Sequence, residues 1–380
     1  MPSRNAPSID LVVGTRPNIV KAAPLLHELV RGGWRCRLVF LAQHSMAAMT
    51  TQVFEDLLVP SSVISRITID SVSIGGRFGE MVEKYADLLD VEPPSMAIVF
   101  GDVDATLAAA FAAKRAHLPV AHVEAGLRSG DMRMPEEINR KMVDSISDLY
   151  FTTIPSGTEN LVRQGITSSR IHFCGNLMID ALLSTLRRCG SGVAESLLPS
   201  LGIRNRAYAV ATFHRPSNVD SPEVLEKVVD LLMLASRQLP VVFPIHPRSA
   251  RALEQHGLRL GSDRIKVIDP LRYSHFAALL SRCRLVITDS GGLQEESSAL
   301  GIPCLTFREN TERPETVSLG TNRLVAFRDA EQVIGEVMEK DMPLPCNIPG
   351  WDGMAASRIA AVLLDWAGGT AAESAPSPSK

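Results

Sequence analysis

The sequence has no excess of basic residues. Lysine and arginine together number 39 against 42 aspartates and glutamates, so the formal net charge is −3 at pH 7. Proteins that bind nucleic acid or a membrane surface usually carry a basic bias, and those partners are therefore disfavoured. An anionic ligand is still compatible with this balance, because a few placed arginines can bind it locally.

The sequence also lacks paired cysteines and long apolar runs. We interpret its cysteines as isolated thiols in a reducing cytosol rather than as a metal site: Cys36, Cys174, Cys189, Cys283, Cys304 and Cys346. The segment Met1–Ser8 is too polar for the core of a signal peptide. No apolar run approaches the roughly 20 residues that a membrane span needs. We expect a cytoplasmic protein without a membrane partner.

Short β-branched runs alternate with longer helical patterns along all 380 residues. This alternation is typical of parallel βα units whose sheet is buried on both faces. The predicted strands of the first half are Ile9–Val13, Arg37–Leu41, Met96–Phe100, Val120–Val123, Leu149–Thr152 and Ile171–Phe173. Those of the second half are Tyr208–Thr212, Val241–Ile245, Ile265–Ile268, Leu285–Thr288 and Cys304–Phe307.

The pattern weakens around Arg187–Asn205, where glycine, serine and proline accumulate. We therefore predict two Rossmann-like α/β domains with parallel sheets, at residues 1–190 and 191–352. An amphipathic helix at 353–367 is expected to pack back on the first domain, and the small, polar segment 368–380 is expected to be disordered.

Ligands of open α/β sheets bind beyond the carboxyl ends of the strands. The turn after the first strand, Gly14-Thr15-Arg16-Pro17-Asn18, does not have the Gly-x-Gly-x-x-Gly form of a dinucleotide site. Arg16 would stand at a helix N-terminus, where the helix dipole opposes a cation unless an anion is bound. The turn therefore favours an anion site, and a solvated surface arginine is the alternative.

Carboxylates follow two neighbouring strands of the first half. Asp102 comes just after Met96–Phe100, and Glu124 comes directly after Val120–Val123. A helix-capping role explains one aspartate of the first loop, and a first-turn position explains Glu136 and Glu137. Neither explains Glu124. If the carboxylates of Asp102, Glu124 and Glu136 converge, repulsion and burial should raise at least one pKa toward neutrality, which suits acid–base catalysis.

Two strand ends of the second half carry further candidates. His214 follows a strand beside Arg215, and a structural role, proton transfer or phosphate binding fits it; His246 has a weaker case. Ser290, Gly291 and Gly292 lead from a strand into a helix, where backbone N–H groups and the helix dipole favour a diphosphate. A simple turn is the alternative. Glu296, one turn later, could accept hydrogen bonds from a ribose diol, and Arg313 precedes a further predicted helix.

Several motifs together resemble the non-hydrolysing UDP-N-acetylglucosamine 2-epimerases, which are similar in fold to two-domain glycosyltransferases of the GT-B type. The likeness runs from about Val12 to Val325. Its motifs are GTRPNIVKAAPL, QH, GDVDATLA, HVEAGLRSGDMRMPEEINR, GN, HRPSNVD, DPLRY, TDSGGLQEE and RENTERPETVSLGTNR.

The resemblance implies an active site in the cleft between the domains. It implies that the catalytic residues are Asp102, Glu124, Glu136 and His214. It implies substrate binding by Arg16, Lys21, Arg140, Phe276, Ser290, Gly291, Gly292, Glu296 and Arg313, with Phe276 beside the uracil. A homodimer is implied, and neither a cofactor nor a metal is required.

The implied reaction interconverts UDP-N-acetylglucosamine and UDP-N-acetylmannosamine, through elimination of UDP to a glycal and its re-addition. The alternatives are a hydrolysing epimerase, a GT-B glycosyltransferase and an epimerase of UDP-2,3-diacetamido glucuronic acid, whose carboxylate Arg133 or Lys141 could bind. The sequence departs from many bacterial members at Met46, Pro216 and Pro247, so we do not expect their activation by a second substrate molecule to apply.

Overall fold

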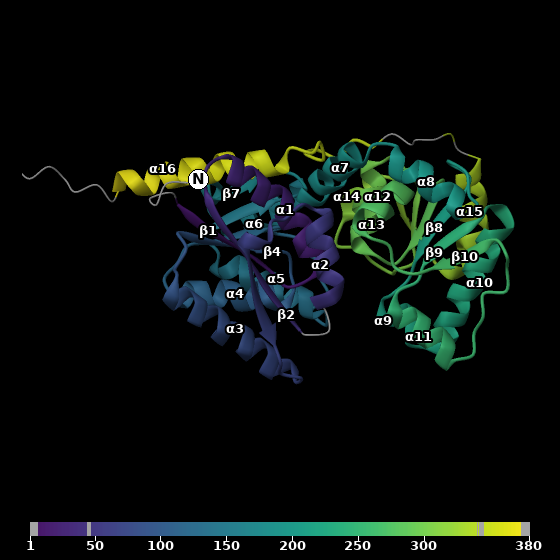
Figure 1. The fold of residues 1–380 in the computed structure, drawn as a ribbon, viewed down its shortest axis with the longest axis horizontal. Coiled ribbons are helices and arrows are strands. Elements are labelled where there is room, and N and C mark those ends of the chain that lie inside the picture. The colour runs from purple at the N-terminus through teal and green to yellow at the C-terminus, as the bar shows by residue number, and fades with distance from the viewer. Residues whose placement is uncertain (1–6, 44–46, 340, 342–345, 374–380) are drawn as a thin grey trace, which may run out of the picture. The chain divides into compact units, whose positions relative to one another are not determined.

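The structure is a computed structural model that describes residues 7–43, 47–339, 341 and 346–373 (Figure 1). Its contacts divide the chain into two compact units. The first unit comprises Met1–Ala181 and Pro349–Lys380, and the second comprises Leu182–Ile348. Each unit is built on one parallel sheet, which confirms the predicted pair of Rossmann-like domains. The location of a site in a cleft between them stays a prediction.

The first unit holds a seven-stranded sheet in the order β3-β2-β1-β4-β5-β6-β7. Its strands are β1 (Ser8–Val13), β2 (Arg35–Gln43), β3 (Ile64–Ile69), β4 (Met96–Phe100), β5 (Val120–Val123), β6 (Leu149–Thr152) and β7 (Ile171–Phe173). The helices that follow them are α1 (Arg16–Arg31), α2 (Ala47–Asp56), α3 (Ile74–Val91), α4 (Asp104–Arg115), α5 (Pro135–Ile146) and α6 (Pro155–Arg163). The strand order reverses direction between β1 and β4, and this switch point is where such sheets bind ligands.

The second unit repeats the plan with six strands in the order β10-β9-β8-β11-β12-β13. They are β8 (Ala209–Thr212), β9 (Val241–Pro244), β10 (Ile265–Ile268), β11 (Leu285–Thr288), β12 (Cys304–Thr306) and β13 (Asn322–Leu324). The helices are α7 (Leu177–Cys189), which enters from the first unit, α8 (Gly192–Ser200), α9 (Pro216–Val219), α10 (Pro222–Gln238), α11 (Pro247–Gln255), α12 (Tyr273–Ser281), α13 (Gly291–Ala299), α14 (Pro314–Ser318) and α15 (Ala330–Met338). The switch point here lies between β8 and β11.

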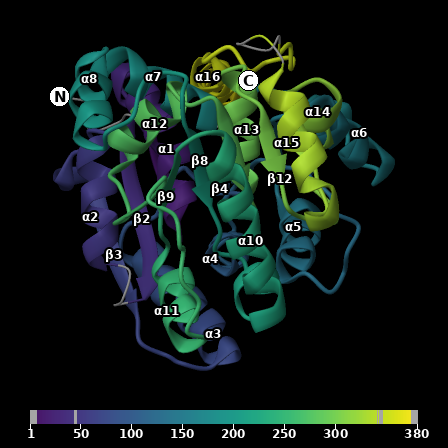
Figure 2. The same ribbon diagram turned by 90° about the vertical axis from the view of Figure 1, so that its right-hand side faces the viewer.

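Alternate residues of β8 enter two different hydrophobic cores, because successive side chains of a strand point to opposite faces. Ala209 and Ala211 pack with α10 and α15, whereas Val210 packs with α8 and α12. Figure 2 shows these two helix layers on either side of the second sheet. Both faces of the second sheet are therefore covered by apolar side chains. Polar side chains that could bind a ligand are confined to the ends of the strands.

Strands β3 and β13 were not predicted. Strand β3 is an edge strand whose residues are mostly half-buried, and Ser65, Arg66 and Thr68 interrupt its apolar pattern. Strand β13 has three residues, two of them polar, and also lies at an edge. An edge strand buries less apolar surface than a central one, so its sequence shows no continuous apolar run.

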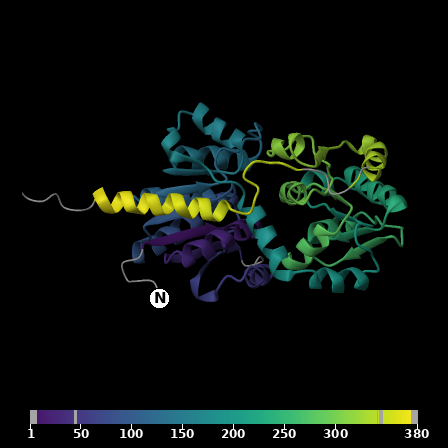
Figure 3. The same cartoon turned by 90° about the horizontal axis from the view of Figure 1, so that it is seen from above.

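The last helix, α16 (Ala355–Glu373), belongs to the first unit and contacts α1 (Figure 3). The buried Asp180 carboxylate accepts hydrogen bonds from the backbone N–H groups of Ala355, at 3.2 Å, and Ala356, at 2.8 Å, and so caps the start of this helix. The helix runs past residue 367, where a disordered tail was predicted to begin. Residues 374–380 lie outside the described residues.

Among the described residues, none of the helices has the length and apolar character that crossing a membrane demands.

The return of the chain to the first unit depends on a close approach of two glycines. Gly175 has a φ of 91°, and a β-carbon there would lie 2.0 Å from the Gly350 carbonyl oxygen. Gly165 has a similar φ of 83°, but a β-carbon there would meet nothing within 4 Å. The two glycines therefore have similar φ angles and differ in the room that a β-carbon would find.

We expect Gly175→Ala to destabilise the protein by at least about 2 kcal/mol more than Gly165→Ala, which carries only the conformational cost of about 1–2 kcal/mol. Thermal denaturation of the two variants measures the difference, at roughly 2–4 °C for each kcal/mol. Equal losses of Tm would show that the Gly175–Gly350 contact yields without cost.

Candidate active site

Glu124 stands at the end of β5 in a strained backbone conformation. Its φ of 69° lies in the left-handed region, which residues other than glycine rarely adopt. Its buried carboxylate forms an ion pair with Lys21 Nζ, which α1 supplies from the other side of the switch point. The side chains of Glu124 and Lys21 are only 5% and 6% exposed. The fold therefore brings together two residues that were predicted separately, Glu124 as catalytic and Lys21 as substrate-binding.

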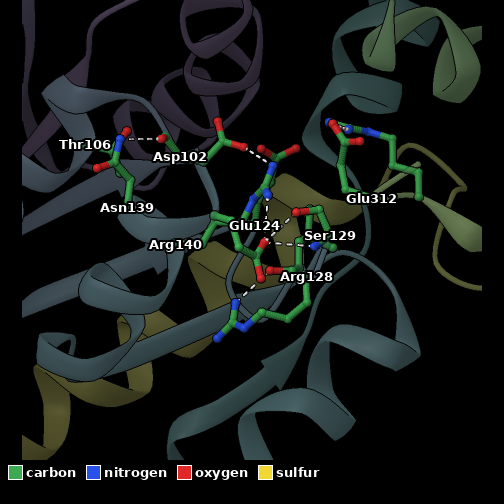
Figure 4. A network of polar contacts seen from close by, with 12 residues as sticks. Asp102, Thr106, Glu124, Arg128, Ser129, Asn139, Arg140 and Glu312 are labelled. Carbon is green, nitrogen blue, oxygen red and sulfur yellow. Dashed lines mark hydrogen bonds and ion pairs between the residues drawn. The ribbon is translucent and has the colours of Figure 1, made fainter. Parts of the chain in front are cut away.

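Asp102 lies beside this pair, in the loop after β4. A β-carbon on the preceding Gly101 would lie 3.1 Å from Glu124 Oε2 and 3.8 Å from Lys21 Nζ, so glycine lets the loop pass close to both groups. The Asp102 carboxylate is ion-paired with Arg140, which reaches it from α5 (Figure 4). Asp102 does not cap α4, whose N-cap is Val103. The capping alternative is thus excluded for Asp102.

Arg140 has a second acidic partner that was not predicted. Glu137 Oε2 lies 3.1 Å from Arg140 Nη1, and Glu137 also accepts hydrogen bonds from Ser129 N at 2.8 Å and Ser129 Oγ at 3.1 Å. Burial acts to raise the pKa of Glu137, but the hydrogen bonds from Ser129 and the charge of Arg140 outweigh it and leave the pKa below its usual value. Glu137 is therefore ionised, and its carboxylate holds the Arg140 guanidinium group.

Glu136, the predicted catalytic residue, is half-buried in the first turn of α5. Within the described part of the chain it has no hydrogen bond or ion pair, in contrast to Glu137. A signal for Glu137 was present, because Glu137, Arg140 and Asp144 are spaced three and four residues apart and so share one helix face. The catalytic role of Glu136 stays a prediction.

A buried charged network lies beneath the carboxylates and was not predicted. His122, in β5, contacts the Gly101 carbonyl oxygen through Nε2 at 2.9 Å and Asp144 Oδ1 through Nδ1 at 2.7 Å. Asp144 Oδ2 accepts from Gly126 N at 3.2 Å and from Arg128 Nη2 at 2.5 Å. The network ties the loops after β4 and β5 to α5.

Asp144 is ionised in this network. Burial acts to raise the pKa of Asp144, but the interaction with His122 and the charge of Arg128 outweigh it and leave the pKa below its usual value. Both ring nitrogens of His122 face acceptors, the Asp144 carboxylate and the Gly101 carbonyl oxygen. An isolated buried carboxylate would be costly, and the hydrogen bonds and positive charge around Asp144 offset that cost.

Mutual repulsion was predicted for the case that the carboxylates of Asp102, Glu124 and Glu136 converge. The structure instead gives Glu124 and Asp102 each a cationic partner, Lys21 and Arg140, so attraction to lysine and arginine dominates the geometry of this part of the site. Arg16 occupies the first position of α1, as predicted. Arg133 and Lys141, the candidates for a sugar carboxylate, are exposed, and Arg133 pairs with Asp131 at 2.8 Å.

In the second unit, His214 stands at the end of β8 against Asp289, which follows β11. The distance from His214 Nδ1 to Asp289 Oδ1 is 3.1 Å. Asp289 is fully buried, whereas the His214 side chain is 41% exposed. His246 lies near it, with ring centroids 5.6 Å apart, and its Nδ1 accepts from Arg248 N at 3.1 Å as the N-cap of α11.

The N-terminus of α13 begins at Gly291 with Ser290 as its N-cap, as the sequence predicted. Arg313 stands against it, because a β-carbon on Gly291 would lie 2.9 Å from Arg313 Nη1. Arg313 forms ion pairs with Glu295 and Glu312, both at 2.9 Å. The N-terminus of α13 and the Arg313 guanidinium group thus lie against each other, an arrangement that suits the binding of a diphosphate.

Two further arginines surround Glu312 and were not predicted. Arg308 Nη2 lies 2.9 Å from Glu312, and Arg215 Nη2 lies 3.8 Å from it. Burial acts to raise the pKa of Glu312, but the charges of Arg313, Arg308 and Arg215 hold it far below its usual value. Burial, together with Arg215 and Arg313, lowers the pKa of Arg308, against the attraction of Glu312. Arginines outnumber acids here by three to two when Glu295 is included, so the cluster can accept an anion.

The remaining predicted residues of the second unit lie on helices of this same region. Glu296 is buried on α13 and accepts a hydrogen bond from Tyr273 Oη at 3.2 Å. Phe276 is half-buried on α12, where it packs against the core. Gly292 is the second residue of α13. Their binding roles stay predictions.

Pro216 and Pro247 begin α9 and α11, where a missing N–H group costs nothing. Met46 and His44, the histidine of the QH motif, lie outside the described residues. Among the residues that are described, no group of three or more histidine, cysteine, aspartate or glutamate side chains could hold a metal ion.

Comparison with known proteins identifies the family. A sequence model described as UDP-N-acetylglucosamine 2-epimerase matches residues 28–364. A UDP-N-acetylglucosamine 2-epimerase of Methanococcus maripaludis is 36% identical over 331 residues, which are 86% of this chain and 89% of that protein. A UDP-2,3-diacetamido-2,3-dideoxy-D-glucuronate 2-epimerase of Pseudomonas aeruginosa is 36% identical over 363 residues, 93% of this chain and 98% of that one.

Solved structures agree with these sequence relatives. The Methanocaldococcus jannaschii UDP-GlcNAc 2-epimerase in complex with UDP-GlcNAc and UDP has a TM-score of 0.84 and 33% identity, and the match covers 94% of this chain and 99% of that one. The Neisseria meningitidis enzyme bound to UDP-GlcNAc has a TM-score of 0.86 and 28% identity, with 94% and 100% covered. The chain therefore belongs to the UDP-N-acetylglucosamine 2-epimerase family and is an isomerase.

Proposed function

We propose that the chain interconverts UDP-N-acetylglucosamine and UDP-N-acetylmannosamine without releasing free sugar. The observation that carries the proposal is the strained, buried Glu124 paired with Lys21, beside Asp102, at the switch point of the first sheet. Backbone strain of this kind is concentrated at functional sites. The names of the relatives support the same reaction.

The chemistry of the substrate explains why carboxylates are needed. The hydrogen on C2 of the sugar is not next to a carbonyl, so a carbanion at C2 would be poorly stabilised. In the proposed reaction a carboxylate of the first unit takes this proton while the C1–O bond breaks and UDP leaves with its electron pair. A second acid returns a proton to the opposite face of C2, and the UDP oxygen then adds back to C1.

The second unit would bind UDP and stabilise it as a leaving group. The N-terminus of α13 and Arg313 supply donors and positive charge for the diphosphate, and Arg308 and Arg215 extend that charge. Glu296 and Phe276 would contact the ribose and the uracil. Arg16, Lys21 and Arg140 would line the first unit's part of the site. A homodimer and a cytoplasmic location stay predictions.

The glucuronate substrate of the Pseudomonas aeruginosa relative is the second candidate, because that relative is as similar as the others. We favour the neutral sugar, since Arg133 and Lys141, the candidates for binding a sugar carboxylate, are both exposed. Arg133 is paired with Asp131, and Lys141 contacts the Met132 sulfur. A glycosyltransferase has no need of the proton-transfer group around Glu124. A hydrolysing epimerase would release N-acetylmannosamine, which the first experiment detects.

The reaction can be followed by NMR after incubation of the protein with UDP-N-acetylglucosamine in deuterated water. We expect deuterium at C2 and a mixture of two UDP-sugars, because the proton removed exchanges with solvent before one is returned. Release of free sugar would identify a hydrolysing enzyme. Absence of both exchange and product would overturn the proposal for this substrate, and the glucuronate can be tested in the same way.

Glu124→Gln is expected to lower the rate of C2 exchange by about 10²- to 10⁴-fold, because the amide cannot accept the proton. Binding of UDP, measured by calorimetry, should change little. The matched control is Glu159→Gln, which removes an exposed carboxylate paired with Arg163 on α6, and it should retain full activity. Near-full activity of Glu124→Gln would show that another group is the base.

Arg313→Gln is expected to weaken UDP binding about 10- to 100-fold, through loss of a charge-assisted hydrogen bond worth roughly 1.5–3 kcal/mol. Arg323→Gln serves as the control, since Arg323 pairs with Glu336 on a half-exposed surface of the same unit. Calorimetric titration with UDP compares the two. Equal Kd values would place the diphosphate away from Arg313.

A further inference from the structure

The pairing of β8 with β11 brings His214 and Asp289 together. These strands are parallel neighbours in which Thr212 pairs with Thr288, so the residues that follow each strand emerge at the same edge of the sheet. The Asp289 side chain is fully buried there, one residue before Ser290, the N-cap of α13. A buried carboxylate at this place requires partners that offset its desolvation.

The partners of Asp289 divide between its two oxygens. Oδ2 accepts hydrogen bonds from Arg215 N at 2.9 Å, His214 N at 3.1 Å and Asn218 Nδ2 at 3.2 Å. Oδ1 faces the ring of His214, with Nδ1 at 3.1 Å, and its backbone N at 3.3 Å. Asn218 is itself fixed by a hydrogen bond to the Phe307 carbonyl at 3.1 Å. The orientation of the carboxylate is thus set by the backbone and by Asn218.

Asp289 acts on His214 as an acceptor. Burial acts to raise the pKa of Asp289, but the hydrogen bond and charge of His214 and the backbone N–H groups outweigh it, so the pKa lies below its usual value. A carboxylate only accepts hydrogen bonds, so Nδ1 of His214 must carry a proton. Whenever the ring carries one proton, its lone pair is then on Nε2, and the His214 side chain is 41% exposed.

We propose that Asp289 is a positioning residue that holds His214 in the Nδ1-protonated tautomer, so that the Nε2 lone pair takes up a proton from solvent and returns it to C2 of the sugar nucleotide as the second acid. The proton-transfer role of His214 in this inference rests on the proposed function, whereas the tautomer of His214 does not depend on it. Asp289 also links two parts of the site, because a single buried carboxylate orients the histidine and lies next to the N-cap of the helix that would hold the diphosphate. Asp289, which sets the tautomer of His214, is thus adjacent in the chain to the turn that would bind the diphosphate of UDP.

Asp289→Asn tests the proposal through the tautomer itself. The amide oxygen is expected to take the place of Oδ2, where three donors converge, which leaves the amide NH₂ facing Nδ1 of His214. That nitrogen must then accept, and the ring must switch to the Nε2-protonated form. Long-range ¹H–¹⁵N correlation of the full chain labelled in histidine, with His214 identified by its loss in His214→Gln, reads the tautomer without substrate.

We expect Nδ1 protonation in the unsubstituted chain and Nε2 protonation in Asp289→Asn. We also expect a fall in kcat of about 10²- to 10⁴-fold with little change in the Kd for UDP. Asp220→Asn is the matched control, because Asp220 is a half-exposed aspartate of the same segment, paired with Arg248. It should leave both the tautomer and kcat unchanged.

The proposal is overturned if His214 of the unsubstituted chain is Nε2-protonated, a measurement that needs no variant to fold. It is also overturned if Asp289→Asn keeps the Nδ1-protonated form, or switches it and leaves kcat unchanged. An unsubstituted chain that fails to epimerise while showing the expected tautomer and its switch would contradict the proposed function alone.

Discussion

The parallel pairing of β1 with β4, and of β8 with β11, determines which side chains can meet. At each of these switch points the connections leave in opposite directions, so the strand ends are not covered by a crossover helix. Lys21 reaches Glu124 across the first switch point, and His214 reaches Asp289 across the second. The strands themselves are buried in apolar cores on both faces, so polar chemistry is confined to these edges.

Charge compensation is the second constraint, since both units bury ionised groups. In the first unit Asp144 is held between His122 and Arg128, and Glu137 is held by Arg140 and Ser129. Removing one partner from such a set leaves a buried charge uncompensated, which costs more than the pair contributes. These partners therefore tie the loops on which Asp102 and Glu124 stand to α5.

The central strands and the helix starts could be predicted from the sequence, because they depend on local patterns. A run of five apolar residues marks β4, and prolines mark the first turns of α1 and α5. Edge strands such as β3 could not, since their half-buried residues carry no continuous pattern. Glu124 was identifiable because a charged residue directly after a buried strand has no structural explanation, whereas its ion pair with Lys21, 103 residues away, depends on tertiary structure.

Partners within the site were harder to predict than the site residues themselves. Glu136 and Glu137 are adjacent in sequence and chemically alike, and only the direction of the helix face shows that Glu137 is buried against Arg140. Asp289 directly precedes the turn of Ser290, Gly291 and Gly292, and nothing in that sequence indicates that its carboxylate faces His214. In both cases the function of the residue depends on where its side chain points, which short-range patterns leave open.

On the proposed function, the two units supply different halves of one elimination. The C2 hydrogen is too weakly acidic for a carboxylate to remove it while UDP stays bound to C1. Departure of UDP makes its removal possible, because the electrons of the C–H bond form the double bond as the diphosphate takes those of C1–O. A proton acceptor at Glu124 and Asp102 would therefore be ineffective without the cations and helix N-terminus that stabilise the leaving diphosphate. The proposed reaction therefore depends on leaving-group stabilisation as much as on proton transfer, and a substitution that impairs either one should slow the elimination.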